Sequence, residues 1–279
     1  MFKVSLKTYN VKWAAKFKEE AQKIMKSLEK NIVSILHIGS TSIDDMTANE
    51  VIDIAICVNS LEYLKQYKQK LANLLYLDIG YFNQENWFIF GKYNDKFHLH
   101  LGPYDNEDIV NLLLFKLYLS KHADYKEFYI DLKKKLLKNS EESFYEFNKR
   151  HFVVKVILLA KLEYLNGGIT ESDFEIIYKN GIINDKEKMI KGIKRVCQAD
   201  EEKLKDEIPR YKELHSKMID ETEEAMRKSP FCCKFTITSG DGNPVEMNEK
   251  EERMLKTMMS NTMVRQYLMA QDADHKGLK

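Results

Sequence analysis

Two short apolar runs constrain the fold of this chain more than any other feature of its sequence. The first covers residues 32–38, is rich in β-branched residues and stops at Gly39, and the second covers residues 51–58. Runs of this length and composition are typical of buried strands. The second run places Asp53 between two isoleucines, and a carboxylate in a buried strand is costly unless a metal ion or a positive side chain pairs with it. The sequence therefore predicts a sheet with a polar site in its interior.

Helices and a hairpin are predicted around these two strands. Apolar side chains recur at three- and four-residue steps, with charged residues between them, at about 11–30, 61–75, 110–121, 125–138 and 142–165. Residues 87–90 and 97–101 lie on either side of a polar turn, which is typical of a β-hairpin. We therefore expect an α+β fold in which helices flank a sheet.

A pair of glycines at 167–168 predicts where the first domain ends. Glycine carries a high cost in backbone entropy inside a helix, and the helical pattern stops at this pair. We expect one domain at 1–166 and a second, mainly α-helical domain at 169–279. The second domain contains a methionine-rich amphipathic segment at about 254–269. Such a stripe forms either a core or an adaptable face for a protein partner or for self-association.

The balance of charge argues against a nucleic-acid partner. The chain has 44 lysines and arginines against 43 aspartates and glutamates, a formal charge of +1, so its surface as a whole does not attract polyanions. No apolar run approaches the about 20 residues of a membrane span, and the first residues lack the apolar core of a signal peptide. The four cysteines fit neither a disulfide framework nor a zinc motif. We expect a cytoplasmic protein without membrane contact.

The turn after the first strand combines residue types that bind phosphate. Gly39 and Ser40 follow this strand directly. A glycine has no Cβ, so backbone N–H groups and a neighbouring hydroxyl can approach phosphate oxygens closely. Asp53 on the neighbouring strand can hold a divalent ion such as Mg²⁺ against those oxygens. The alternative is an ordinary turn at a strand end, with Asp53 in a structural ion pair or hydrogen bond.

Two histidines are further candidates for metal ligation. His98 and His100 are two residues apart on a predicted strand, so their imidazoles point to the same face. Imidazole ligands favour Mn²⁺ or Zn²⁺ over Mg²⁺, which prefers oxygen. The alternative is that both histidines lie on the solvent face of an edge hairpin.

Several motifs, taken in chain order, resemble the GrpB-like family, which is placed within the nucleotidyltransferase superfamily. The matching positions are residues 4–6, 9–13, 37–42, 52–54 and 98–101, then Phe115, Tyr118, Leu119, His122, Tyr145, Lys149 and residues 152–153. The similarity covers about residues 4–165. It implies a nucleotidyltransferase-fold mixed sheet with flanking helices, followed by a segment for which we find no family.

The resemblance also implies which side chains form the site. Nucleotide binding is implied for Gly39, Ser40, Thr41, Ser42, Lys116 and Lys149. Asp53 is then the catalytic residue, and Asp53, His98 and His100 are the expected metal ligands. Lys116 stands where the family has an arginine, which keeps the charge but loses the two-pronged geometry of a guanidinium group.

Three departures from the family pattern make the expected pocket more negative or less complete. Ala55 stands where characterised nucleotidyltransferases have a second carboxylate, Asn49 stands where the family has a lysine, and Asp44 with Asp45 replaces a Pro-Gly pair. The resemblance implies a nucleotidyltransferase that uses Mg²⁺ or Mn²⁺ and moves a nucleotidyl group from a nucleoside triphosphate to an unknown acceptor. Ala55 favours the alternative, a non-catalytic adaptor that binds a nucleotide or another phosphorylated ligand and contacts a protein through its second half.

Overall fold

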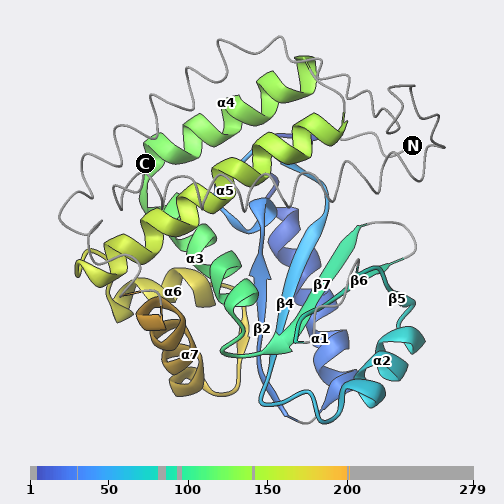
Figure 1. Ribbon diagram of the computed structural model, residues 1–279. Coiled ribbons are helices and arrows are strands. Elements are labelled where there is room, and N and C mark those ends of the chain that lie inside the picture. Colours follow the sequence, from blue (N-terminus) through green and yellow to red (C-terminus); the bar gives the residue numbers. More distant parts are fainter. Residues whose placement is uncertain are drawn as a thin grey trace, which may run out of the picture.

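The computed structural model describes residues 5–29, 31–80, 86–92, 96–139, 142–199 and 201 (Figure 1). Its strands are β1 (Leu6–Lys7), β2 (Ile32–Ile38), β3 (Ala48–Asn49), β4 (Ile52–Val58), β5 (Tyr76–Asp78), β6 (Phe88–Lys92), β7 (Phe97–Pro103) and β8 (Ile182–Ile183). Its α-helices are α1 (Lys12–Leu28), α2 (Leu64–Asn73), α3 (Glu107–Lys121), α4 (Ala123–Asn139), α5 (Glu142–Leu165), α6 (Phe174–Tyr178) and α7 (Lys186–Ala199). Two 3-10 turns are η1 (Ser40–Ser42) and η2 (Glu171–Asp173).

Six of these strands form one mixed sheet in the order β5-β6-β7-β4-β2-β8. Strands β4 and β7 are parallel, and every other neighbouring pair is antiparallel. The predicted hairpin is confirmed, because β6 and β7 pair antiparallel. The expected α+β fold, a mixed sheet with flanking helices, is confirmed as well.

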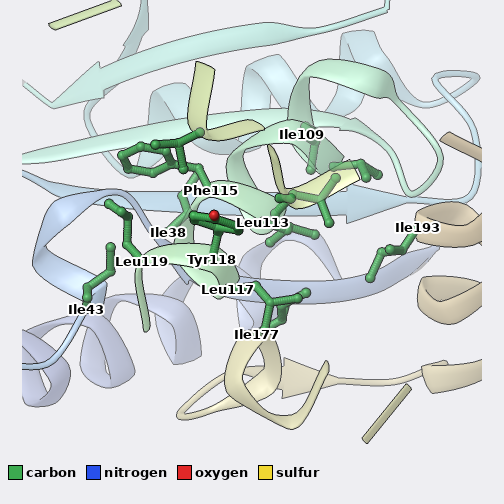
Figure 2. Close-up of a cluster of buried hydrophobic side chains, with 14 of the residues drawn as sticks. Ile38, Ile43, Ile109, Leu113, Phe115, Leu117, Tyr118, Leu119, Ile177 and Ile193 are labelled. Carbon is green, nitrogen blue, oxygen red and sulfur yellow. The ribbon is translucent and has the colours of Figure 1, made fainter. Parts of the chain in front are cut away.

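The two faces of the sheet bury separate cores because side chains alternate along each strand. On β4, Ile52, Ile54 and Ile56 belong to a core with α1 and α2. Ala55 and Cys57 point to the opposite face and belong to a core built mainly on α3 and α5. Figure 2 shows this second core, in which the side chains of α3 pack between those of the sheet and the later helices.

Helix α1 covers the first face through a single apolar stripe. The buried residues on this stripe are Trp13, Phe17, Ala21, Ile24 and Leu28. Glu20 is also buried, and its carboxylate accepts hydrogen bonds from Tyr76 at 3.0 Å and Lys92 at 2.5 Å. Burial opposes ionisation of Glu20, but the bonds from Lys92, Lys23 and Tyr76 hold its pKa below the usual value. The Glu20 carboxylate therefore links α1 to strands β5 and β6 through hydrogen bonds.

Residues 169–199 add to the same sheet and core as the first 165 residues. Helix α5 ends at Leu165 and is followed by Gly167, whose φ of 78° suits a glycine after a helix, and the next N–H, of Gly168, bonds to the Glu163 carbonyl at 2.8 Å. Strand β8 then pairs with β2, and α7 packs on α3 and α5. The glycine pair thus lies in the turn that ends α5. The division into domains at 1–166 and 169–279 stays a prediction, and residues 202–279, with the methionine-rich segment, lie outside the described ranges.

Within the described ranges, no helix combines the length and the apolar content needed to cross a membrane.

Candidate functional site

The strand register brings three of the predicted site residues together. Asp53 lies opposite Ile38 on β2 and opposite His98 on β7. Because Asp53 pairs directly with His98 and side chains alternate along a strand, Asp53, His98 and His100 share the face that carries α3. The Asp53 Oδ1 atom lies 3.6 Å from His98 Nδ1 and 3.7 Å from His100 Nε2. A carboxylate and two imidazoles therefore meet where β2 ends and where β4 and β7 begin.

The Asp53 carboxylate is held in its charged form. Burial opposes its ionisation, but the imidazoles of His100 and His98, within 3.7 Å of Oδ1, favour the charged form and lower the pKa of Asp53 far below its ordinary value. The side chain retains 28% of its exposure. The site therefore presents a partly exposed anion to whatever lies above the sheet.

Gly39 is required by the position of that carboxylate. Its φ is 69°, a left-handed value that favours glycine. A Cβ at this position would lie 2.3 Å from Asp53 Oδ2, closer than real contacts allow. The Gly39 turn and the Asp53 carboxylate therefore occupy one site, and the absent side chain makes room for the carboxylate itself.

The hydroxyls that follow Gly39 have different roles. Thr41 donates to the Val51 carbonyl at 3.1 Å, and Ser42 donates to the Gly39 carbonyl at 2.7 Å. Both hydroxyls thus hold the turn in shape. In the part of the chain that the structure describes, the Ser40 hydroxyl makes no hydrogen bond, and this side chain is half-buried. Of the three predicted hydroxyls, Ser40 is the one available to a ligand.

His37 is a structural part of the turn that sequence reasoning gave no role of its own. Its ring stacks on Phe17 with centroids 4.8 Å apart, and its Nε2 atom lies 3.1 Å from the Thr41 hydroxyl. Burial, and then the charge of Lys116, lowers the pKa of His37 to about 3. Since the Thr41 proton goes to Val51, the neutral His37 donates through Nε2 to Thr41. A histidine inside a run of apolar strand residues was the available signal.

Lys116 lies inside the protein and not on the surface of the site. Its ammonium donates to the carbonyls of His37 at 2.9 Å and Ile177 at 3.1 Å. Burial, and then repulsion from Lys179, lowers the pKa of Lys116 to about 7. The predicted nucleotide-binding lysine therefore joins β2 to α6, just before the Gly39 turn. Its position within the apolar run of α3 was a sign of burial.

Lys149, the other predicted lysine, lies on α5 close to a second buried lysine, Lys133. Burial, and then the charge of Lys149, lowers the pKa of Lys133 to about 7. The Lys133 ammonium donates to the carbonyl of Thr47 and lies 4.4 Å from the Tyr129 ring centroid. Lys133, which sequence reasoning did not find, thus binds the segment between η1 and β3, and a nucleotide-binding role of Lys149 stays a prediction.

The three-residue cluster is not a preformed metal centre. Across the described ranges, no three histidine, cysteine, aspartate or glutamate side chains are arranged to hold an ion. The nitrogens of His98 and His100 point at the carboxylate, at distances longer than a hydrogen bond. His100 Nδ1 is buried without a described hydrogen-bond partner, and its ring stacks on Trp87 with centroids 5.6 Å apart. Metal ligation by these histidines stays a prediction.

The fold and the site define an α+β protein whose polar cluster lies at one end of a mixed sheet, against a tight glycine turn. A family model described as GrpB protein matches residues 3–158. The chain belongs to this family.

Named relatives agree with this assignment. The UPF0157 protein YqkA of Bacillus subtilis is 33% identical over 151 residues, which are 52% of this chain and 43% of YqkA. The match thus spans less than half of that relative. The Glutamate-rich protein GrpB of Alkalihalophilus pseudofirmus is 25% identical over 163 residues, which are 55% of this chain and 94% of that protein.

A solved structure also resembles this chain. The conserved protein GrpB from Enterococcus faecalis is 26% identical, with a TM-score of 0.54 over 58% of this chain and 99% of the other. Cid1 in complex with the UTP analog UMPNPP matches at 17% identity, with a TM-score of 0.37 over 59% of this chain and 50% of that chain. A similarity as low as that to Cid1 carries no argument about activity.

Proposed function

We propose that this chain is a nucleotidyltransferase that binds a nucleoside triphosphate at the Asp53 cluster. One observation carries the proposal: an ionised, partly exposed carboxylate lies against the Gly39 turn, beside two histidines on the same face. The free hydroxyl of Ser40 lies on that turn and can donate to a phosphate oxygen.

A divalent ion fits this site best if it arrives with the nucleotide. Mg²⁺ is commonly held by one or two carboxylates together with substrate phosphates and water. Asp53 can serve as that single carboxylate, with His98 and His100 orienting it or adding a ligand to Mn²⁺. The bound ion would neutralise charge on the phosphates.

The proposed reaction is a displacement at the α-phosphorus. An acceptor hydroxyl oxygen forms the new P–O bond, the bond from the α-phosphorus to the bridging oxygen breaks, and pyrophosphate leaves with that oxygen. The acceptor proton passes to water. Ser40 and the Gly39 turn position the phosphates, and Asp53 supplies the negative charge that holds the divalent ion. The chain therefore acts mainly by orientation and electrostatics.

Ala55 favours a second candidate, a binding protein without catalysis. It lies on the face of Asp53, two residues along β4 and opposite His100, where a second carboxylate would complete a two-metal site. A protein of this kind binds the same triphosphate but releases no pyrophosphate. The two candidates therefore differ in turnover and not in binding.

Calorimetry on the full chain tests the binding step. We expect ATP, GTP, CTP or UTP to bind with Mg²⁺ or Mn²⁺, and Asp53→Asn to weaken binding at least tenfold while far-UV circular dichroism is unchanged. Asp78→Asn is the matched control, because Asp78 lies on edge strand β5 and pairs with Lys68. No binding of any triphosphate with either ion would overturn both candidates.

An assay of pyrophosphate release then distinguishes the transferase from the non-catalytic binding protein, the adaptor. Turnover that depends on both the metal ion and Asp53 supports the transferase. Tight binding without pyrophosphate release, across a wide range of hydroxyl acceptors, supports the adaptor.

A further inference from the structure

Exposed apolar side chains gather on and beside the edge strand β5. Leu75, Leu77 and Ile79 are 67%, 60% and 37% exposed, and all three are large hydrophobic residues. Their only companion among the large exposed hydrophobic residues of the described ranges is Val11, at 72%, which precedes α1. Such clustering marks a contact surface more often than scattered exposure does.

The strand register places this patch on the same face as the polar cluster. Asp53 lies opposite His98, His98 opposite Gly91, and Gly91 opposite Leu77. Directly paired residues point to the same side of a sheet, so these four positions form one row across four strands. The row is polar at β4 and β7, lacks a side chain at β6, and is apolar at β5.

Ile79 covers the gap in this row. A Cβ at Gly91 would lie 2.9 Å from Ile79 Cδ1, so the isoleucine side chain lies over the glycine. Gly91 is the direct neighbour of His98. Apolar surface therefore begins one strand away from the polar cluster. Of the helices on this face, α6 and α7 pack on β2 (Figure 1). Helix α3 packs on β2 and β4 and reaches β7 only near its far end, where a Cβ at Gly102 would lie 2.9 Å from Ile109 Cδ1.

We propose that Leu77 and Ile79 bind the apolar part of the acceptor. This proposal rests on the transferase function proposed above. The Gly39 turn lies on the β2 side of Asp53, so the triphosphate and its leaving pyrophosphate belong to that side. Attacking and leaving oxygens lie roughly in line in phosphoryl transfer, so the acceptor approaches from the opposite side, over β7 and β6.

The spacing of the strands sets the size of this acceptor. Neighbouring strands lie about 4.8 Å apart, so the row from Asp53 to Gly91 spans roughly 10 Å and the row to Leu77 roughly 14 Å. An acceptor that uses the surface carries its hydroxyl at one end and an aliphatic or aromatic group at the other. Short polyols do not reach Ile79.

The binding surface can be tested without any turnover. The probe is 8-anilinonaphthalene-1-sulfonate, whose fluorescence reports exposed apolar surface. We expect the full chain to bind it, the double variant Leu77→Ser/Ile79→Ser to bind it at least tenfold more weakly, and Val11→Ser to behave as the unchanged protein. Equal binding by the double variant would overturn the proposal. So would light scattering that shows a dimer which the double variant dissolves, because a second copy would then occupy this face.

The role of the surface is tested by two primary alcohols that differ only in apolar length, ethanol and 1-octanol. We expect pyrophosphate release from ATP to show a kcat/KM at least tenfold higher for 1-octanol, because apolar contacts discriminate by about tenfold or more. The double variant should remove this preference and leave ATP binding unchanged. Equal kcat/KM values would overturn the acceptor assignment alone. ATP binding without pyrophosphate release for either alcohol would count against the transferase, and the acceptor assignment would fail with it.

Discussion

The two faces of strand β4 show how one strand serves both stability and a site. On the face of α1, Ile52, Ile54 and Ile56 are almost fully buried. On the face of α3, Cys57 is fully buried, but Asp53 at the start of the strand keeps 28% of its side-chain exposure. A charged group is tolerated only where water or a partner reaches it. Both faces belong to the same strand, so the strand alone does not decide where a polar site can form. The site forms where the helices that pack on the α3 face no longer cover β4.

The largest expected effect on stability comes from a substitution on the buried face of β4. Ile54→Ala removes three carbon atoms from a fully buried side chain, and we expect the free energy of unfolding to fall by about 2–5 kcal/mol. The adjacent substitution Asp53→Asn removes a charge that His98 and His100 stabilise in the folded protein, so we expect a smaller loss than in Ile54→Ala, together with the loss of nucleotide binding. Urea denaturation measures both variants. Equal destabilisation by the two would contradict the division between a structural face and a functional face.

Much of this division could be predicted from the sequence. The β-branched runs predicted β2 and β4, and the two-residue spacing of His98 and His100 predicted a shared face. The pairing partner of β7 could not be predicted in this way, because periodicity gives the face of a strand but not its neighbour. The parallel pairing of β4 with β7 is what places His98 beside Asp53.

Other parts of the site depend on contacts distant in sequence. The Lys116 ammonium bonds to a carbonyl of α6, 61 residues later, and no local pattern indicates such a pair. Strand β8 has only two residues, so its apolar pair could not be distinguished from a loop. The glycines at 167–168 correctly predicted the end of a helix. They gave no information about the packing of residues 169–199 on the first core, because that packing also depends on contacts distant in sequence.

The next effect is a pH dependence that originates on the buried face. The pKa of His37 is about 3 in the folded protein against 6.5 for an ordinary histidine. As the pH falls below 6.5, the unfolded chain takes up this proton first, so stability present above pH 6.5 is lost toward pH 3. The expected slope is about 1.4 kcal/mol per pH unit.

His37→Gln isolates this contribution. Its amide can still donate to Thr41 but has no proton to gain in this range. Urea denaturation of both proteins between pH 7 and pH 4.5 should show a steeper loss for the unchanged protein. Parallel curves would mean that His37 is not kept neutral by burial.

The third prediction concerns the junction of the turn and the carboxylate. Gly39→Ala introduces a Cβ 2.3 Å from Asp53 Oδ2 and strains a left-handed backbone, so we expect a loss of about 1–3 kcal/mol and of nucleotide binding. Gly167→Ala is the matched control, because its φ is also positive, at 78°, and no heavy atom lies within 4 Å of the added Cβ. The control should show backbone strain alone and bind nucleotide normally. If it lost binding too, the effect would not come from Asp53.

The smallest effect on stability distinguishes the two serines of the turn. Ser42 donates to the Gly39 carbonyl, so Ser42→Ala should destabilise the protein by about 0.5–1.5 kcal/mol. Ser40→Ala removes a hydroxyl that makes no hydrogen bond within the described ranges, so we expect a change of less than about 0.5 kcal/mol. Its effect should appear in calorimetry instead, as a several-fold weaker affinity for the triphosphate, because a bond to a charged oxygen is lost. Unchanged affinity in Ser40→Ala would remove this hydroxyl from the proposed phosphate site and leave Asp53 as its main determinant.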